Sequence, residues 1–176
     1  MNSTDLAALL SALSPFQSLD QDELHLLADK MQVVDLAEDA PLFAEGDAGD
    51  SWYLILSGEI SIVRHGEEGV PPHTLAHLEA GDSFGEMALL EGTPRMASAT
   101  AFSTARLAKL PRESFEALLA GGHPCATGLL RHMSRALCQR LREVTVILQD
   151  IVDNPAPVRA DPAALTKLIH AVMAHN

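Results

Sequence analysis

The sequence predicts a mainly β fold with flanking helices: an antiparallel, jelly-roll-like β-roll with N-terminal helices and a long C-terminal helix. Two patterns support this prediction. Short β-rich runs with glycine-centred turns recur between residues 33 and 110, which is typical of an antiparallel roll or barrel. A continuous apolar pattern with a helical period occupies residues 124–152. The 176 residues, 47% of them hydrophobic, are enough for one domain with a real core.

Two short helices should precede the roll. Ser3 or Thr4 can cap the first of them, which stops before Pro15. Asp20 can cap the second, and Glu23 follows three residues later at the spacing of a capping box. The apolar face of the second helix consists of Leu24, Leu27 and Met31.

Seven short strands should follow these helices. Their lengths, and the alternation of apolar and polar residues within 59–63, favour strands over helices. The turns between them contain Gly46, Gly58 and Gly81, which accept positive φ without strain. The predicted β-rich runs are residues 33–34, 42–43, 52–56, 59–63, 75–78, 97–101 and 105–110.

Pro111 should begin a helix that ends at Gly121, and the long helix should then run from about Pro124 to Val152. Seven positions of the long helix alternate by four and three residues, and six of them are apolar, as in a coiled-coil seam. They are Leu130, Ser134, Leu137, Leu141, Val144, Leu148 and Ile151. A helix of ~29 residues is ~43 Å long, more than a roll ~30 Å across can cover. The pattern favours a parallel homodimer through residues 130–151; the alternative is a stripe that covers the open side of the roll.

The chain divides into two parts on this interpretation. Residues 1–152 form the domain, with its N-terminal helices and long C-terminal helix. Residues 153–176 form a proline-containing linker and a short terminal amphipathic helix, which begins near Asp161.

Residues 84–99 are the most informative segment. Gly85 lets the backbone come close to a ligand, and the run from Glu86 to Leu90 can form about one helical turn whose free N–H groups favour an anion. Arg95 adds a guanidinium fork that suits phosphate oxygens. Glu86 is better suited to accept hydrogen bonds from sugar hydroxyls. Together these groups predict a small phosphorylated sugar or nucleotide as ligand.

This segment resembles the phosphate-binding cassette of the cyclic nucleotide-binding domain family. The matching residues are Phe84-Gly85-Glu86-Met87-Ala88-Leu89-Leu90 and Pro94-Arg95-Met96-Ala97. Three further stretches fit the same family, and the resemblance covers roughly residues 14–150. They are Phe43-Ala44-Glu45-Gly46-Asp47, Trp52-Tyr53-Leu54-Ile55-Leu56-Ser57-Gly58-Glu59 and Ala80-Gly81-Asp82.

The resemblance implies a role for each cassette residue. Arg95 would pair with the cyclic phosphate, and Glu86 would bind the ribose 2′-hydroxyl. Gly85 and Ala97 belong to the same implied site, and backbone N–H groups near three further residues would line the phosphate: Met87, Ala88 and Met96. The candidates for the base pocket, for which a core role is the alternative, are Leu54, Leu56, Ile62 and Leu75.

Two positions bear on which nucleotide is bound. In the bacterial catabolite-activator branch of the family, the long helix brings a Thr-Ser pair to the adenine amino group. The same region here reads Arg140-Leu141-Arg142, so those hydroxyls are missing, although an arginine can stack on a purine. Members that prefer cyclic GMP often carry threonine directly after the cassette arginine, where this chain has Met96. The resemblance therefore favours cyclic AMP over cyclic GMP.

The resemblance predicts a non-enzymatic sensor that presents its helices to an effector protein. Only 24 residues follow Val152, against about seventy in the winged helix-turn-helix of Crp/Fnr-type transcription factors. The alternatives are a dimeric scaffold that no longer binds nucleotide and a truncated transcription regulator of that type. His65, His73 and His77 raise a fourth reading, a metal-dependent enzyme on a cupin-like roll, but the sequence has no His-x-His pair.

Composition narrows the remaining classes. The formal charge of −12 disfavours direct nucleic-acid binding. Cys125 and Cys138 lack CxxC spacing, which argues against a metal site and for free thiols in a reducing compartment. There is no run of 18 apolar residues and no basic, signal-like start. We therefore expect a cytoplasmic protein that does not span a membrane.

Overall fold

The computed structural model describes residues 1–13, 16–65 and 72–153. The predicted linker and terminal helix, 154–176, lie outside these residues. The helices are α1 (Ser3–Ala12), α2 (Gln21–Lys30), α3 (Glu86–Glu91), α4 (Arg112–Ala120) and α5 (Pro124–Asp153). The strands are β1 (Gln32–Leu36), β2 (Pro41–Phe43), β3 (Ser51–Ser57), β4 (Ile60–Arg64), β5 (His73–Leu78), β6 (Ser83–Phe84), β7 (Ser98–Ala101) and β8 (Ala105–Pro111).

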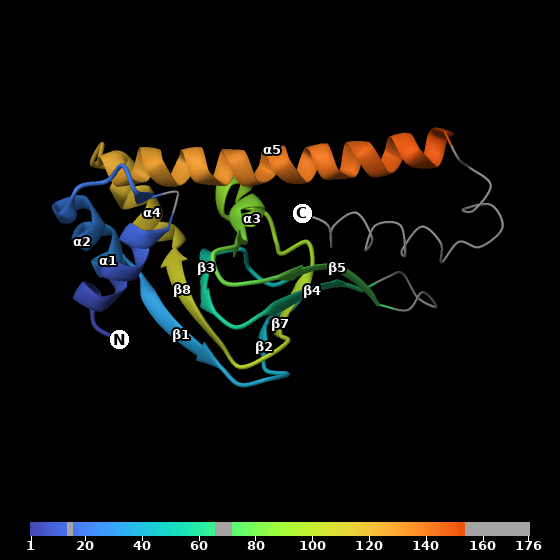
Figure 1. Ribbon diagram of the computed structural model, residues 1–176, viewed down its shortest axis with the longest axis horizontal. Helices are drawn as coiled ribbons and strands as arrows, with labels where there is room; N and C mark the ends of the chain where they lie inside the picture. The colour runs from blue at the N-terminus through green and yellow to red at the C-terminus, as the bar shows by residue number, and fades with distance from the viewer. Residues whose placement is uncertain (14–15, 66–71, 154–176) are drawn as a thin grey trace.

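The strands form two four-stranded antiparallel sheets, which together make the predicted β-roll (Figure 1). One sheet has the order β1-β8-β3-β6 and the other β2-β7-β4-β5. An apolar cluster fills the space between them, with buried side chains from both sheets. Its buried members are Tyr53, Ile55, Ile60, Phe84, Ala99, Ala101, Ala105 and Leu107.

A second core lies between the first sheet and the helices. Strand β3 contributes to both cores, because its successive side chains point to opposite faces of the sheet. Trp52 and Leu54 pack with the helices, whereas Tyr53 and Ile55 face the inside of the roll. This explains why β3 reads as a continuous apolar run and not as an alternating one.

The helix caps differ in part from the prediction. Asn2, and not Ser3 or Thr4, caps α1, because its side chain accepts from the backbone N–H of Asp5 at 2.8 Å. Asp20 caps α2 as predicted, accepting from the N–H of Glu23. The Glu23 carboxylate accepts from the N–H of Cys125 at 2.9 Å, at the start of α5.

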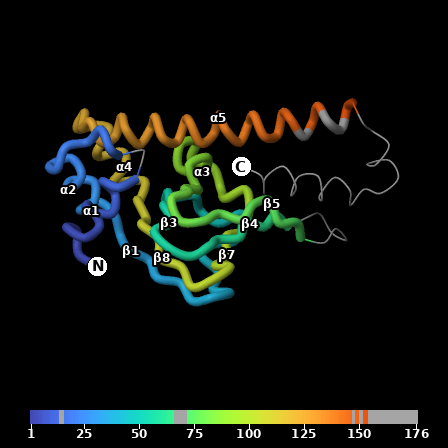
Figure 2. Tube along the Cα trace, viewed as in Figure 1, coloured from blue at the N-terminus to red at the C-terminus, as the bar shows by residue number. Residues whose placement is uncertain are grey.

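Helix α5 runs along one side of the molecule, past α4 and then past α3 (Figures 1 and 2). Its first part is buried against the helix-side core through four residues: Cys125, Ala126, Leu129 and Met133. Burial raises the pKa of the Cys125 thiol to about 12, with Glu23 adding to the effect.

The predicted heptad stripe follows a different face of α5. Leu130 packs on the core and Leu137 is half-buried, but Ser134, Val144 and Leu148 are exposed and Leu141 is 67% exposed. The side chain of Ile151 lies outside the described residues. The distal stripe therefore does not cover the open side of the roll.

Strand β6 was not predicted, because its two residues are too few to show a period. It pairs with β3, and it delivers the chain directly into Gly85 and α3. Strand β5, which precedes β6 in the chain and pairs with β4 in the other sheet, carries a β-bulge. Ile62 opposes Ala76 and Val63 opposes Thr74, so Leu75 is the extra residue. Bulges of this kind redirect a side chain and bend an edge strand.

Candidate functional site

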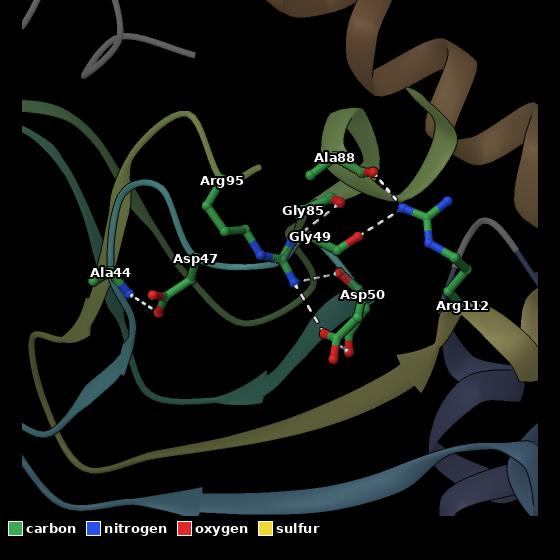
Figure 3. Close-up of polar contacts among 9 residues, drawn as sticks. Ala44, Asp47, Gly49, Asp50, Gly85, Ala88, Arg95 and Arg112 are labelled. Carbon is green, nitrogen blue, oxygen red and sulfur yellow. Dashed lines mark hydrogen bonds and ion pairs between the residues drawn. The ribbon is translucent and has the colours of Figure 1, made fainter. Parts of the chain in front are cut away.

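The backbone of Arg95 is fixed by the loop that follows β2. The N–H of Arg95 donates to the carbonyl oxygen of Asp47 at 2.8 Å, and the N–H of Gly46 donates to that of Arg95 at 2.9 Å. The Asp47 carboxylate closes the loop by accepting from the N–H of Ala44 at 2.8 Å (Figure 3). The side chain of Arg95 therefore extends from a backbone position that is held in place, as a fixed ligand contact requires.

The guanidinium of Arg95 points into the protein and is almost fully buried, with 4% of the residue exposed. Its carbon Cζ lies 4.3 Å from the ring centre of Phe43 and 5.6 Å from that of Tyr53. Nη2 donates to the carbonyl oxygen of Ser51 at 2.8 Å, and Nη1 to that of Gly85 at 3.3 Å (Figure 3). Desolvation lowers the pKa of Arg95, and it raises the pKa of the neighbouring Tyr53.

Arg95 is held without a close charged partner. The nearest carboxylate oxygen, on Asp50, is 3.9 Å from Nη2, and the Asp50 side chain is 68% exposed. A hydrogen bond from the Ser51 hydroxyl lowers the pKa of Asp50. Within the described residues, Nε of Arg95 has no hydrogen-bond partner. The buried cation is thus only weakly compensated and suits an anion.

Gly85 is required where it lies. Its φ is +86°, and a Cβ atom there would lie 2.7 Å from Nη1 of Arg95 and 3.0 Å from the Ser51 carbonyl oxygen. Predicted as a point of close backbone approach, Gly85 makes that approach to the cassette's own arginine.

Glu86 begins α3 and is 1% exposed. Its Oε1 accepts a hydrogen bond from Nη1 of Arg140 on α5. Nη2 of Arg140 donates to the carbonyl oxygen of Ser83 at 2.7 Å. The other carboxylate oxygen, Oε2, is buried and has no partner in the described part of the chain. Such an oxygen is an acceptor whose desolvation is uncompensated.

The structure separates the remaining cassette residues by exposure. Ala88 and Ala97 are buried, whereas Met87, Leu90 and Met96 are exposed, Met96 by 54%. The structure contains no ligand, so the phosphate contact proposed for the amides of this turn stays a prediction.

A cavity of about 510 Å³ lies between α5, strand β5 and the turn that leads into β6. Arg140 lines it, next to its contact with Glu86. Leu141 and Arg142, predicted with Arg140 as base contacts, are exposed to solvent. Leu54 is fully buried in the helix-side core, which is the alternative role given for it in the sequence analysis. Leu56 and Ile62 are half-buried against the two cores, and Leu75 is half-buried at the bulge.

Three further residues connect this site to the helices, and none of them was predicted from the sequence. Ser83 Oγ and His132 Nε2 share a hydrogen bond of 2.8 Å. Two side chains of α5, those of His132 and Arg140, therefore bind Ser83 of β6. Arg112, the first residue of α4, donates through Nη2 to the carbonyl oxygens of Gly49 at 2.7 Å and Ala88 at 2.6 Å (Figure 3). These contacts join positions at least 24 residues apart, which no local pattern reveals.

Other site types find no support in the described residues. There, no three His, Cys, Asp or Glu side chains come together in a way that could hold a metal ion. No helix in residues 1–13, 16–65 and 72–153 is long and apolar enough to cross a membrane.

Sequence comparison agrees with this geometry. The profile of the cyclic nucleotide-binding domain matches residues 33–121, which contain both sheets and the Glu86–Arg95 cassette. The chain belongs to the cyclic nucleotide-binding domain family. Its antiparallel sheets with flanking helices are the β-roll of that family, followed here by the long α5.

Known members of the family resemble the chain over different lengths. A CRP-like cAMP-activated global transcriptional regulator from Mycobacterium tuberculosis is 29% identical over 151 residues, 86% of this chain and 65% of the regulator. A cAMP-dependent protein kinase regulatory subunit from Aspergillus niger is 37% identical over 111 residues, 63% of this chain and 25% of the subunit. A solved cyclic nucleotide-binding domain from Methylobacillus flagellatus has a TM-score of 0.70 at 29% identity, over 80% of this chain and 79% of that one. The chain therefore spans less than two thirds of the full length of the transcriptional regulator and of the kinase regulatory subunit.

Proposed function

We propose that this chain is a regulatory module that binds a cyclic nucleotide, with cyclic AMP as the preferred ligand, and changes the arrangement of its helices on binding. The observation that carries the proposal is the pair of incompletely satisfied buried groups in the cassette: Oε2 of Glu86 and the guanidinium of Arg95. One is an acceptor and the other a cation, as a ribose hydroxyl and a cyclic phosphate require.

The phosphate would bind at Arg95. The guanidinium donates through Nη2 and Nη1 to two neutral carbonyl oxygens, those of Ser51 and Gly85. Charge-assisted hydrogen bonds to a phosphate are roughly twice as strong as neutral ones, so an anion would displace these contacts favourably. The rings of Phe43 and Tyr53 would keep the guanidinium plane in place during the exchange.

The ribose would bind at Glu86. Because Arg140 occupies Oε1, the 2′-hydroxyl would donate to Oε2 and satisfy the buried acceptor. The purine would then lie toward the cavity beside α5, which Arg140 lines and where Arg140 contacts Glu86 of the cassette. Met96, in place of threonine after Arg95, favours adenine over guanine by the resemblance stated above.

The response would pass to α5 through Arg140, which contacts both Glu86 and Ser83. A ligand that rearranges Glu86 changes the contacts of α5 with the roll, which is the differential interaction a conformational shift requires. We further propose that residues 130–151 form a parallel homodimer, because the distal stripe is exposed and apolar: Leu141, Val144 and Leu148. The output would go to an effector protein, without direct contact to nucleic acid or membrane.

A scaffold that no longer binds nucleotide is the alternative, as is a truncated Crp/Fnr-type regulator. One observation favours the scaffold: Nη1 and Nη2 of Arg95 already donate to carbonyl oxygens of the protein itself. Against it stands Oε2 of Glu86, whose burial without a partner has no use in a scaffold.

Calorimetry on the purified chain tests the proposal. Cyclic AMP, cyclic GMP and cyclic di-GMP should be titrated separately, and 2′-deoxy cyclic AMP should then isolate the ribose contact. We expect cyclic AMP to bind, and its 2′-deoxy analogue to bind at least tenfold more weakly, since one hydrogen bond to a charged group is worth about 1.5–3 kcal/mol. At ~100 times its Kd, cyclic AMP should add about 2.7 kcal/mol to the free energy of unfolding. Absence of binding by all three nucleotides at millimolar concentration would establish the scaffold reading instead.

A further inference from the structure

We propose that Arg112 is the positioning residue through which occupancy of Arg95 reaches α4, by way of the three-residue segment 49–51. This inference rests on the proposed function, since it names the route by which that site would act on the helices. Arg140 binds the first residue of α3, Glu86, whereas Arg112 binds further along the same helix, at Ala88.

The segment 49–51 lies between the two arginines (Figure 3). On one side, Nη2 of Arg95 donates to the carbonyl oxygen of Ser51. On the other side, Nη2 of Arg112 donates to the carbonyl oxygen of Gly49, and the backbone N–H of Arg112 donates to that of Asp50 at 2.7 Å. Of these three consecutive carbonyl groups, the first two are therefore bound by Arg112, the first residue of α4, and the third is bound by Arg95.

Arg112 also holds the cassette helix itself. Its Nη2 donates to the carbonyl oxygen of Ala88, which also accepts from the N–H of Gly92 at 3.0 Å where α3 ends. Both hydrogens of one nitrogen are thus used, one on the loop and one on α3. In the described residues, no other side chain donates a hydrogen bond to both the loop at Gly49 and α3 at Ala88.

The loop and α3 are packed tightly against each other at Gly49 and Ala88. A Cβ atom on Gly49 would lie 2.2 Å from Cβ of Ala88 and 2.5 Å from the carbonyl oxygen of Thr93, so only glycine fits between them. A shift of segment 49–51 must therefore be shared by α3, and Arg112 carries it to α4 at that point.

The ligand would act on this unit through Arg95. A phosphate that binds Nη2 of Arg95 would remove the hydrogen bond that this nitrogen donates to the carbonyl oxygen of Ser51. Ser51 is the last residue of segment 49–51. Of the two arginines, only Arg112 would then bind segment 49–51. Relaxation of the segment would displace the start of α4. Arg112 would not touch the ligand, so its loss should weaken the response more than the affinity.

Hydrogen exchange on the free, full-length chain tests the link without ligand. Arg112→Ala should accelerate amide exchange in residues 86–92 by about tenfold or more, because two hydrogen bonds from a charged donor are lost. Glu116→Ala is the matched control: it removes the 4.0 Å ion pair with Arg112 and keeps both carbonyl contacts. Exchange in the control should stay within about twofold of wild type, as expected for an exposed pair.

Amide exchange in α4, Arg112–Ala120, provides the second readout, because α4 is the helix that Arg112 begins. Saturating cyclic AMP should change exchange in α4 in wild type and in Glu116→Ala. In Arg112→Ala, calorimetry should still detect binding within about tenfold of wild type, while most of this ligand-dependent change in α4 is lost. Arg112→Lys, with a point charge in place of the fork, should be intermediate and replaces Arg112→Ala if that variant does not fold.

The outcomes separate the two proposals. A wild-type chain that binds no cyclic nucleotide overturns the proposed function, whereas the exchange experiment still decides whether Arg112 joins the cassette to α4. Unaltered exchange in Arg112→Ala overturns the link. A full ligand-dependent change in α4 in that variant, with binding intact, overturns its role in transmission.

Discussion

Arg140 and Glu86 form an ion pair that joins α5 to the first residue of α3, and the same guanidinium donates to the carbonyl oxygen of Ser83 in the preceding strand β6. The carboxylate is 1% exposed, whereas the Arg140 side chain is 35% exposed. The helix therefore contributes the outer, partly solvated half of a pair whose inner half is fixed in the roll.

Removal of Arg140 should leave that carboxylate buried and unpaired. We expect Arg140→Ala to lower the free energy of unfolding by about 2 kcal/mol, below the roughly 3–5 kcal/mol of a fully buried pair, because Arg140 is partly exposed. Urea denaturation measures this change. Arg142→Ala, on an exposed neighbour, should stay within about 0.5 kcal/mol of wild type. Equal effects of the two substitutions would mean that the ion pair adds nothing to stability.

Arg95→Ala should abolish nucleotide binding in calorimetry and should also lower the melting temperature. The stability loss follows from the structure, since the guanidinium covers the Phe43 ring and satisfies two buried carbonyl oxygens. Arg95→Lys should recover part of the binding, because a point charge cannot bind two oxygens in a fixed plane. The control is Arg64→Ala, which removes an exposed cation at its pair with Glu45. Wild-type affinity in Arg95→Ala would refute the cassette assignment.

The exposed stripe allows a clean test of the dimer. Leu141→Glu places a charge on a side chain that is 67% exposed, so the fold of one chain should be unaffected. In a parallel seam, two such charges would face each other, and we expect a folded monomer in light scattering with unchanged circular dichroism. Gln149→Glu adds the same charge at another exposed position of α5, outside the stripe, and should remain dimeric. A wild-type protein that is already monomeric at tens of micromolar contradicts the dimer.

The stability should fall in mild acid through His132. Burial lowers the pKa of His132 below its ordinary value of 6.5, and the charges of Arg140 and Arg135 lower it further. The unfolded chain therefore takes up the proton first, so this group's contribution is complete above pH ~6.5 and declines as the pH falls from there toward the lowered value. Urea denaturation at pH 7.5 and 5.5 should show a larger drop for wild type than for His132→Gln. Identical drops would assign the acid sensitivity to other groups.

Two glycines should respond differently to alanine. Gly49→Ala should destabilise the protein by about 3 kcal/mol or more, because the Cβ atom meets the Thr93 carbonyl oxygen and the Ala88 Cβ, neither of which can rotate away. At Gly81, φ is +98° and nothing lies within 4 Å of the added atom, so backbone strain of about 1–2 kcal/mol is the whole cost. Thermal denaturation of both variants measures the difference. A larger loss at Gly81 would show that the contact around Gly49 is loose.

Local pattern was enough to predict the roll, its seven longer strands and the two C-terminal helices, because periodicity and turn residues act over a few positions. It failed where the deciding contact is distant in sequence. Arg140 was predicted only as a purine contact, and its partner Glu86 lies 54 residues away. Arg112 had no predicted role, and its partners come from a loop 63 residues earlier and from α3. At α1, Ser3 and Thr4 were predicted as alternative caps, whereas the residue whose side chain caps the helix is Asn2.

In the proposed response, we expect α5 to act as a lever. Its fulcrum is the Gly121–Gly122 turn, and the roll holds it no further out than the neighbourhood of Arg140 and Glu143 in the described residues. From Pro124, Arg140 is ~24 Å along the axis and Asp153 is ~44 Å, so a 1 Å displacement at Arg140 becomes about 2 Å at the far end. A partner that grips the last turns of this helix would therefore read the state of the nucleotide site amplified, without approaching the pocket.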